Sequence, residues 1–99
     1  MSNRFYHIVK SAKPVLVDFY ADWCVPCQLM PPILREVKDQ FKHHVRILKV
    51  NVDQHPDIAS KCKVSNIPAI VVFQEGKIQW CGVGVQQATD ISIALKEIL

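Results

Sequence analysis

Apolar residues recur at three- and four-residue intervals in several stretches of the chain, a spacing that predicts amphipathic helices. This pattern covers residues 3–11 and returns from Cys24 to about Phe41. A short helix is expected over about 56–62, where a proline suits the first turn. Thr89 is a candidate N-cap for a last helix. That helix is marked by Ile91, Ala94, Leu95 and Ile98.

Other stretches follow the pattern of β-strands. Residues 15–20 are an almost continuous apolar run, as in a strand buried on both faces, and residues 45–52 alternate in part. Residues 69–74 and 77–83 predict two strands joined by a hairpin at Glu75-Gly76. The order α, β, α, β, α, β, β, α predicts a mixed sheet with helices on both faces. The first two strands should be parallel, with a right-handed crossover, and the last two antiparallel.

Length and composition favour one globular domain. Ninety-nine residues with 49% hydrophobic and 21% charged side chains fit a single core and argue against disorder. The net charge of +3 is small and the cations are scattered, so no nucleic-acid partner is expected. No apolar run approaches the roughly 20 residues of a membrane span, and no signal-peptide pattern opens the chain. We therefore expect a cytoplasmic protein without a membrane partner.

The candidate chemistry is a Cys-x-x-Cys pair, Cys24 and Cys27, where a strand meets a helix. Cys24 is expected at the helix start, where unsatisfied N–H groups and the helix dipole favour a thiolate. Cys27 is expected one turn along, with its sulfur more shielded. Cys24 would then attack a substrate disulfide, and Cys27 would resolve the mixed disulfide. Pro31 and Pro32 remove backbone donors and predict a kink near Cys27 and Gln28.

Beyond the cysteine spacing, the chain resembles the thioredoxin family. The resemblance is carried by the segment VLVDFYADWCVPCQ and by Pro32, Val50–Pro56, Asn66–Ala69, Phe73–Lys77 and Val83-Gly84. It implies dithiol–disulfide exchange and an α/β thioredoxin fold, with residues 1–99 as a single domain. Thioredoxins usually open with a β-strand, whereas this chain begins almost at once with a helix. We therefore expect a four-stranded mixed sheet flanked by helices, lacking or shortening that first strand, with the strand at 45–52 on an edge.

The resemblance assigns roles to two residues behind the cysteine pair. Asp18 matches the buried aspartate of the family, and a carboxylate in the middle of a buried strand should have a raised pKa. It would pass a proton to or from Cys27 during resolution. Lys49 matches the lysine on the neighbouring strand that pairs with this aspartate. A purely structural pairing of Asp18 with Lys49 is the alternative interpretation.

The resemblance also implies an apolar substrate groove beside the cysteine pair. Pro68 matches the proline whose preceding peptide bond is cis, and Ile67 would offer its backbone to an extended substrate. Trp23 matches the tryptophan packed beside the pair, for which simple packing is the alternative. The groove would be formed by Trp23, Val25, Pro26, Ile67, Pro68, Val83 and Gly84.

The function implied by the resemblance is that of a monomeric, cytoplasmic protein-disulfide reductase. It would bind no cofactor, receive electrons from NADPH through a thioredoxin reductase, and pass them to disulfide-containing proteins. Val25 stands where thioredoxins typically carry Gly, and Gln28 where Lys is common, so the redox potential stays open. The alternatives are a disulfide oxidase or isomerase in an oxidising compartment, and a thioredoxin-fold binding module whose chemistry is dispensable.

A zinc half-site is the alternative interpretation of the cysteine pair, but zinc needs further ligands at tight spacing. Cys62 and Cys81 lie far apart in the sequence, and we expect them to be small buried hydrophobic residues, with redox regulation as the alternative interpretation. His43 and His44 are adjacent at the start of a predicted strand, so their side chains should point to opposite faces. We therefore expect no metal site.

Overall fold

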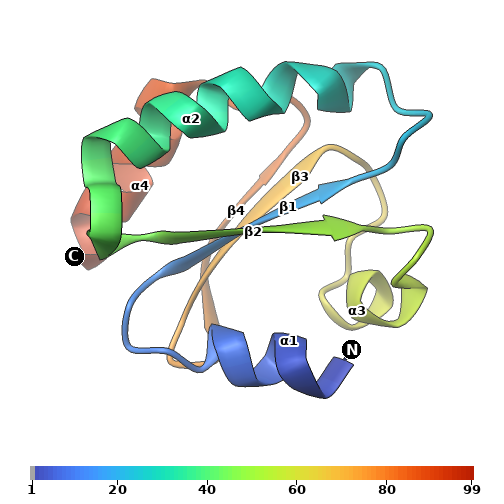
Figure 1. Ribbon diagram of the computed structural model, residues 1–99, viewed down its shortest axis with the longest axis horizontal. Helices are drawn as coiled ribbons and strands as arrows, with labels where there is room; N and C mark the ends of the chain where they lie inside the picture. The colour runs from blue at the N-terminus through green and yellow to red at the C-terminus, as the bar shows by residue number, and fades with distance from the viewer. Residues whose placement is uncertain (1) are drawn as a thin grey trace.

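The computed structural model describes residues 2–99, in which a four-stranded sheet lies between two pairs of helices (Figure 1). Two short 3-10 turns, η1 and η2, lie on either side of the second helix. The elements in chain order are α1 (Ser2–Val9), β1 (Val15–Tyr20), η1 (Pro26–Leu29), α2 (Met30–Phe41), η2 (Lys42–His44), β2 (Arg46–Asn51), α3 (Pro56–Lys61), β3 (Ala69–Gln74), β4 (Lys77–Val83) and α4 (Ala88–Ile98). Among the described helices, none has the length and apolarity required to cross a bilayer.

The strands follow the order β2-β1-β3-β4 across the sheet. β1 pairs in parallel with β2 and antiparallel with β3, and β3 pairs antiparallel with β4. This arrangement confirms the predicted four-stranded mixed sheet and the edge position of the strand at 45–52. The β3–β4 hairpin turns at Glu75 and Gly76, whose φ angles of 54° and 79° are both positive. A tight two-residue turn needs this backbone conformation, which glycine adopts without strain.

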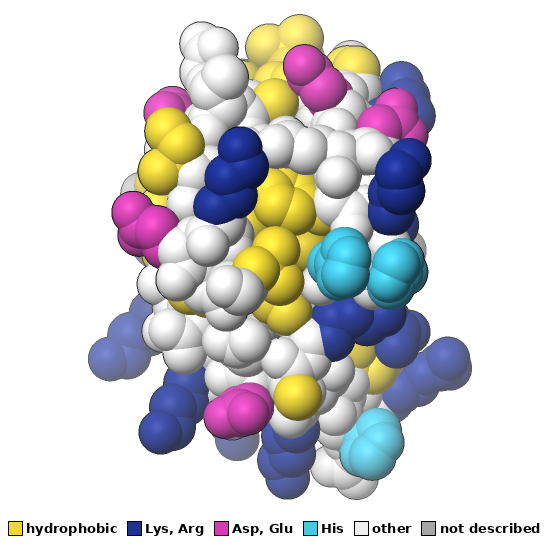
Figure 2. All heavy atoms as spheres, turned by 90° about the vertical axis from the view of Figure 1, so that its left-hand side faces the viewer, with side chains coloured by type: hydrophobic (Ala, Val, Ile, Leu, Met, Phe, Trp, Pro, Cys, Tyr) yellow, Lys and Arg dark blue, Asp and Glu magenta, His cyan; other side chains and the backbone are white. Residues whose placement is uncertain are grey.

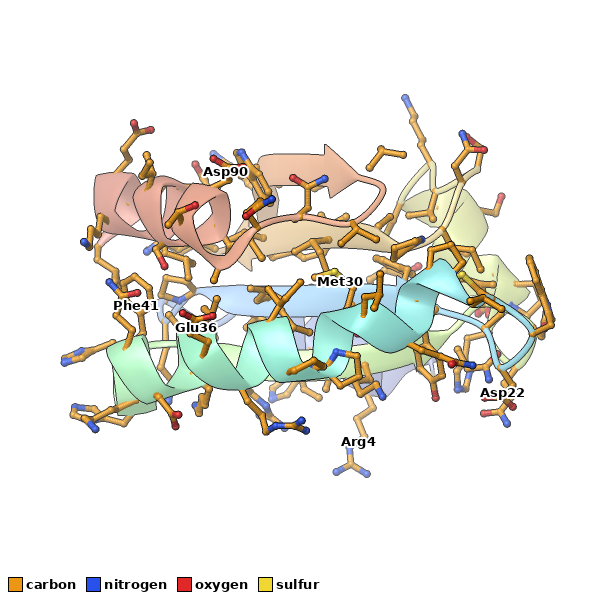
Figure 3. The ribbon with its side chains drawn as sticks, turned by 90° about the horizontal axis from the view of Figure 1, so that it is seen from above. Arg4, Asp22, Met30, Glu36, Phe41 and Asp90 are labelled. Carbon is orange, nitrogen blue, oxygen red and sulfur yellow. A yellow bond between two sulfur atoms is a disulfide. The ribbon has the colours of Figure 1, made fainter. Side chains whose placement is uncertain are left out.

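Successive side chains of the strands enter two separate apolar layers, because a strand presents alternate residues to opposite faces. α1 and α3 cover one face of the sheet, and α2 and α4 cover the other (Figure 1). The first layer includes Phe5, Val17, Phe19, Ile58 and Val71. The second includes Leu16, Met30, Leu34, Ile70 and Leu95. From above, α2 and α4 lie side by side over the strands (Figure 3). Met30, at the start of α2, is fully buried in this second layer.

The bounds predicted for three strands match the structure, whereas those predicted for the first helix do not. β1, β3 and β4 begin and end where their runs predict. α1 ends at Val9 rather than at residue 11. The reason is a tighter last turn, in which the N–H groups of Lys10 and Ser11 donate to carbonyls three residues back, at His7 and Ile8.

The continuous helix predicted from Cys24 to Phe41 is wrong, although the predicted irregularity near Cys27 and Gln28 is present. Residues 26–29 form the 3-10 turn η1, and the α-helix starts only at Met30. Pro31 has no N–H to donate to Cys27. The Cys27 carbonyl instead accepts the N–H of Met30. The missing donors of the prolines thus explain why the segment of the cysteine pair winds more tightly than α2.

Two local predictions are corrected by the structure. Thr89 is not the cap of the last helix, because α4 begins at Ala88 and its N-cap is Gln87, whose side chain makes no capping bond. His43 and His44 do not point to opposite faces. They lie in the turn η2, not in a strand, and their ring centroids are 4.2 Å apart. The two rings lie side by side at the end of the molecule where β2 begins, with Lys and Arg side chains just beneath them (Figure 2).

Candidate active site

Cys24 and Cys27 form a disulfide between the end of β1 and the start of α2, with their Cα atoms 5.3 Å apart. Cys24 precedes the turn η1 rather than starting a helix. The backbone N–H of Cys27 nevertheless donates to Cys24 Sγ at 3.2 Å. A donor directed at sulfur stabilises negative charge there, so this contact favours a thiolate on Cys24 in the reduced protein.

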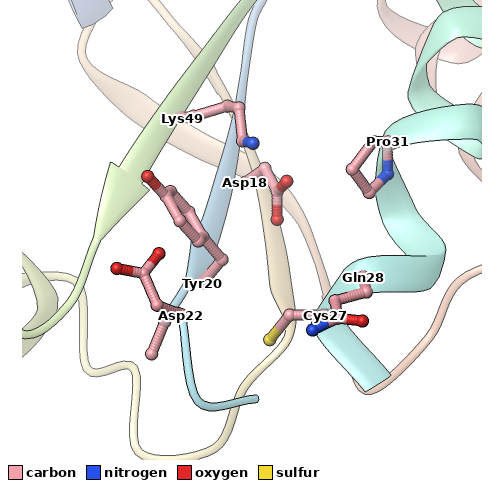
Figure 4. A pocket seen from close by; sticks show the side chains of 8 residues that line it. Asp18, Tyr20, Asp22, Cys27, Gln28, Pro31 and Lys49 are labelled. Atoms are coloured by element: carbon pink, nitrogen blue, oxygen red, sulfur yellow. The ribbon is translucent and has the colours of Figure 1, made fainter. Parts of the chain in front are cut away.

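The expected difference in shielding between the two cysteines does not appear in their exposure. Cys24 is 4% exposed and Cys27 5% exposed. What distinguishes them is their surroundings. Cys27, but not Cys24, lines a cavity of about 210 Å³ between β1, β2 and the start of α2. The cavity is also lined by Asp18, Tyr20, Ala21, Asp22, Gln28, Pro31 and Lys49 (Figure 4).

Asp18 is the unusual residue of this cavity. Its side chain is 1% exposed, and neither carboxylate oxygen has a hydrogen-bond partner in the described part of the chain. Burial raises the pKa of Asp18 to about 6, and the positive charge of Lys49 opposes this rise. Asp18 lies between Lys49 and Cys27 in the cavity (Figure 4). A carboxylate with this pKa can hold or release a proton near neutral pH.

Lys49 lies opposite Asp18 in the parallel pairing of β1 and β2. No ion pair joins the two side chains within the described residues. The Lys49 ammonium instead lies 4.5 Å from the centroid of the Tyr20 ring, in a cation–π contact. Lys49 therefore acts on Asp18 through its field across the cavity, and the carboxylate keeps its free acceptor positions.

The expected groove residues lie around the disulfide. The Ile67–Pro68 peptide bond is cis, as the resemblance implied, and Ile67 packs against the cluster of Ala21, Cys24 and Cys27. The Pro68 carbonyl accepts the N–H of Gly84 at 2.8 Å, which holds the end of β4 beside the cis bond. The apolar or small residues of this group that reach the surface are Trp23, Val25, Pro26, Val83 and Gly84.

Asp53 is a site residue that the sequence reasoning missed. Its Oδ2 accepts the indole N–H of Trp23 at 2.8 Å. Asp53 is placed by the buried side chain of Asn51, whose Oδ1 accepts the backbone N–H groups of Asp53 and Gln54 at 2.9 and 3.3 Å. The available sequence signal was the Asn-x-Asp spacing after a strand, which is typical of a turn closed by an asparagine side chain.

The other two cysteines differ from each other. Cys62 is half-buried beside the α1 and α3 layer, and burial raises the pKa of its thiol. The prediction that Cys81 is buried is wrong, because it lies on β4, the other edge of the sheet, and is exposed. Both are free thiols. Across residues 2–99, no three His, Cys, Asp or Glu side chains are grouped so that they could hold a metal ion.

Comparison with known proteins identifies the family and the fold. The sequence model of the thioredoxin family matches residues 1–97. The thioredoxin of Acidithiobacillus ferridurans is 36% identical over 89% of this chain and 82% of its own. Thioredoxin 1 of Chlorobaculum tepidum is 42% identical over 81% of this chain and 80% of its own. The oxidised mitochondrial thioredoxin 3 of Saccharomyces cerevisiae superposes with a TM-score of 0.87 at 31% identity, covering 97% of this chain and 89% of that one.

Proposed function

The chain belongs to the thioredoxin family, and we propose that it reduces disulfides in other proteins through Cys24 and Cys27. Its reaction class, thiol–disulfide exchange, follows from the family, the fold and the Cys24–Cys27 disulfide. The observation that carries the proposed mechanism is the cavity shared by Cys27 and the buried, unpartnered carboxylate of Asp18. A buried carboxylate beside one cysteine of the pair supports Asp18 as the proton acceptor of Cys27.

The first step starts from the reduced pair. The Cys24 thiolate attacks one sulfur of a substrate disulfide, a Cys24–substrate disulfide forms, and the other substrate sulfur leaves as a thiolate that takes a proton from water. Cys24 is the better attacking group, because the Cys27 N–H is directed at its sulfur. Cys27 stays protonated during this step.

The second step releases the substrate. Asp18, with a pKa of about 6, is mostly a carboxylate at pH 7 and accepts the proton of the Cys27 thiol. The Cys27 thiolate attacks Cys24 Sγ, the Cys24–Cys27 disulfide forms, and the second substrate sulfur leaves as a thiolate. The cavity of about 210 Å³ has room for water that would carry the proton between Asp18 and Cys27.

The surface around the disulfide supports an extended peptide as substrate. Ile67 lies on the chain just before the cis bond, where its backbone can pair with a substrate segment in a short β-type contact. The exposed apolar side chains of Trp23, Val25 and Val83 flank this position. This surface would bind a substrate mainly through the backbone of the substrate and through apolar contacts. Because neither depends on particular side chains, the enzyme would accept many substrate sequences.

The source of electrons and the site of action are part of the same proposal. Two electrons leave the protein in each cycle, so a reductant must reopen the Cys24–Cys27 disulfide. A thioredoxin reductase that uses NADPH fills this role, and the electrons reside on the two sulfurs with no bound cofactor. The reducing direction suits the cytoplasm, where thiols are kept reduced. We expect the protein to act there as a monomer.

A trapping experiment tests the assignment of the two cysteines. In Cys27→Ser the first step proceeds and the second cannot, so a covalent complex with a disulfide-containing protein should accumulate through Cys24 and be released by dithiothreitol. Cys24→Ser should form no complex and lose turnover. Cys81→Ser is the matched control, because Cys81 is an exposed thiol outside the site, and it should behave as wild type. Trapping through Cys62 or Cys81, or full activity in Cys24→Ser, would contradict the proposal.

A further inference from the structure

The outer edge of β2 is open along the middle of the molecule. β2 is the last strand on its side of the sheet, and it lies nearest the viewer with no element drawn in front of it (Figure 1). On its inner side, the Arg46 N–H donates to Pro14 and the Val52 N–H to Tyr20, at 3.0 and 2.9 Å. Because backbone direction alternates along a strand, residues 47 and 49 direct their N–H and C=O groups outward. The open edge thus offers two donors and two acceptors.

The open edge has a shallow hollow on each side of the sheet. On the α2 side, a hollow of about 320 Å³ contains Ile47 and Leu34 together with the cations Arg35, Lys38 and Lys49. On the α1 side, a hollow of about 220 Å³ is lined by Arg4, Phe5, Ile8, Arg46, Leu48, Lys49 and Val50. A strand added to β2 would place its side chains alternately over these two hollows. Each hollow offers an apolar floor and positive charges above it.

The charge around this edge is of one sign. Five exposed cations surround it, namely Arg4, Arg35, Lys38, Arg46 and Lys49. Arg4 projects from α1 on the same side of the molecule as β2 (Figure 3). Asp18 is the only carboxylate among the residues lining the two hollows, and it is buried beneath the surface. Two copies of this edge would bring like charges together, whereas acidic side chains would be attracted to both hollows.

We propose that the outer edge of β2 binds an extended acidic segment of a partner protein, which adds to the sheet as a fifth strand. Backbone bonds to Ile47 and Lys49 supply the pairing, apolar side chains of the segment lie on Ile47 and Leu48, and acidic ones reach the surrounding cations. This docking surface lies on the sheet edge and not in the substrate groove. It shares Lys49 and the buried Asp18 with the cavity behind Cys27, but its pairing uses the backbone of β2 and no group that reacts.

The opposite edge of the sheet is built differently. β4 pairs with β3 through a register shift, in which Val72 lies opposite Trp80 and Phe73 opposite Ile78. Such a bulge interrupts the regular row of backbone groups and protects an edge from further pairing. Among the described strands, β2 shows no such irregularity in its pairing with β1. The regular, basic edge is therefore the one suited to an added strand.

Amide hydrogen exchange followed by NMR tests the pairing directly. The probe is a capped peptide of repeating Glu-Glu-Val-Val, which places acidic and apolar side chains on both faces when extended. Its Lys-Lys-Val-Val counterpart is the control. Adding the acidic peptide should slow exchange at the amides of Ile47 and Lys49, and the basic peptide should not. Slowed exchange that depends on protein concentration without any peptide would show pairing between copies and overturn the proposal.

Two kinds of variant complete the test. Ile47→Pro removes an outward N–H at an edge position where proline is tolerated, and it should weaken binding of the acidic peptide about tenfold, as expected when a hydrogen bond loses its donor. Ile47→Val keeps the N–H and is the matched control. Arg46→Glu, which leaves the backbone unchanged, should also weaken binding if Ile47→Pro fails to fold. Disulfide exchange should be unchanged throughout. Equal binding to all variants, or no binding to the wild type, would overturn the proposal.

Discussion

The two faces of β1 are almost equally buried and are used in opposite ways. Val15, Val17 and Phe19 enter the layer under α1 and α3, and all three are fully apolar. Leu16 faces the other layer and so does Asp18, a carboxylate with no hydrogen-bond partner among the described residues. The first face stabilises the fold by packing. On the second face, the buried charge of Asp18 destabilises the fold, and the same carboxylate provides a proton acceptor beside the cysteine pair.

The raised pKa of Asp18 makes the stability of the fold depend on pH. Burial raises this pKa from 3.8 to about 6, so the folded protein holds the proton to a higher pH than the unfolded chain does. The contribution of this group to stability is therefore fully present below about pH 4 and is lost as the pH rises through about 6. At neutral pH the charged carboxylate destabilises the fold while it is ready to accept a proton. At neutral pH, substitutions on the two faces should therefore change the free energy of unfolding in opposite directions.

The largest effect is expected on the apolar face. Phe19→Ala removes a fully buried ring from the α1 and α3 layer and should lower the free energy of unfolding by about 3–5 kcal/mol. Denaturant unfolding measures this loss. The pH dependence of disulfide exchange should stay as in the wild type, because Asp18 lies on the other face of β1. A changed pH profile in Phe19→Ala would contradict the view that the two faces of β1 act independently.

The next effect has the opposite sign. Asp18→Asn removes the buried charge and should raise the free energy of unfolding at pH 7 by up to about 3 kcal/mol, the value of a shift from 3.8 to about 6. The wild type should lose this stability between about pH 4 and about pH 7, and the variant should not. Urea unfolding at several pH values compares them. Parallel stability curves for the two proteins would contradict the assigned pKa.

Asp18→Asn should stabilise the fold but slow the resolution of the mixed disulfide. Without the carboxylate, the Cys27 thiol loses its proton acceptor, and resolution of the mixed disulfide should slow by about a hundredfold at pH 7. In the wild type, the rate of resolution should rise through a pKa near 6. Rapid-mixing measurements of substrate release give this rate. Unchanged release in Asp18→Asn would leave Asp18 as a structural residue only.

The smallest effect is expected at the exposed contact between Trp23 and Asp53. Asp53→Ala removes the acceptor of the indole N–H and should lower stability by about 1 kcal/mol or less, while indole fluorescence reports a more mobile ring. Asp53→Asn keeps an acceptor and is the control. Because this contact belongs to neither layer, the pH dependence set by Asp18 should persist. Loss of this pH dependence in Asp53→Ala would show that the Trp23–Asp53 contact also affects the titration of Asp18.

The sequence predicts the strands well because their signal is local. β1 and β3 are apolar runs buried on both faces, and the Glu75-Gly76 turn defines the β3–β4 hairpin. The segment of the cysteine pair was less predictable. Its apolar period matches a helix, and Pro31 and Pro32 predict an irregularity near Cys27 and Gln28, but neither signal shows that the backbone there forms a 3-10 turn. The result is a 3-10 turn in place of a helix start.

The candidate site was predictable where single residues are unusual for their position. Asp18 is unusual because it is a carboxylate inside an apolar run, and Cys24 and Cys27 because of their spacing. The contact between Trp23 and Asp53 joins residues 30 positions apart. The Asn-x-Asp spacing indicates the turn that holds Asp53 but not its hydrogen bond to Trp23. The adjacent rings of His43 and His44 follow from the backbone of η2, which the alternation of a strand does not describe.

The central claim is that the Cys24–Cys27 pair serves as a reductant. It is tested most directly by its redox equilibrium against a dithiothreitol or glutathione buffer, with Cys62→Ala and Cys81→Ala removing the other thiols. Reductants of the thioredoxin type have potentials of about −270 mV, and disulfide isomerases about −180 mV. We expect a value near the first, with Val25 a tolerated variation. A value near −180 mV would contradict the account and indicate an oxidising or isomerising enzyme.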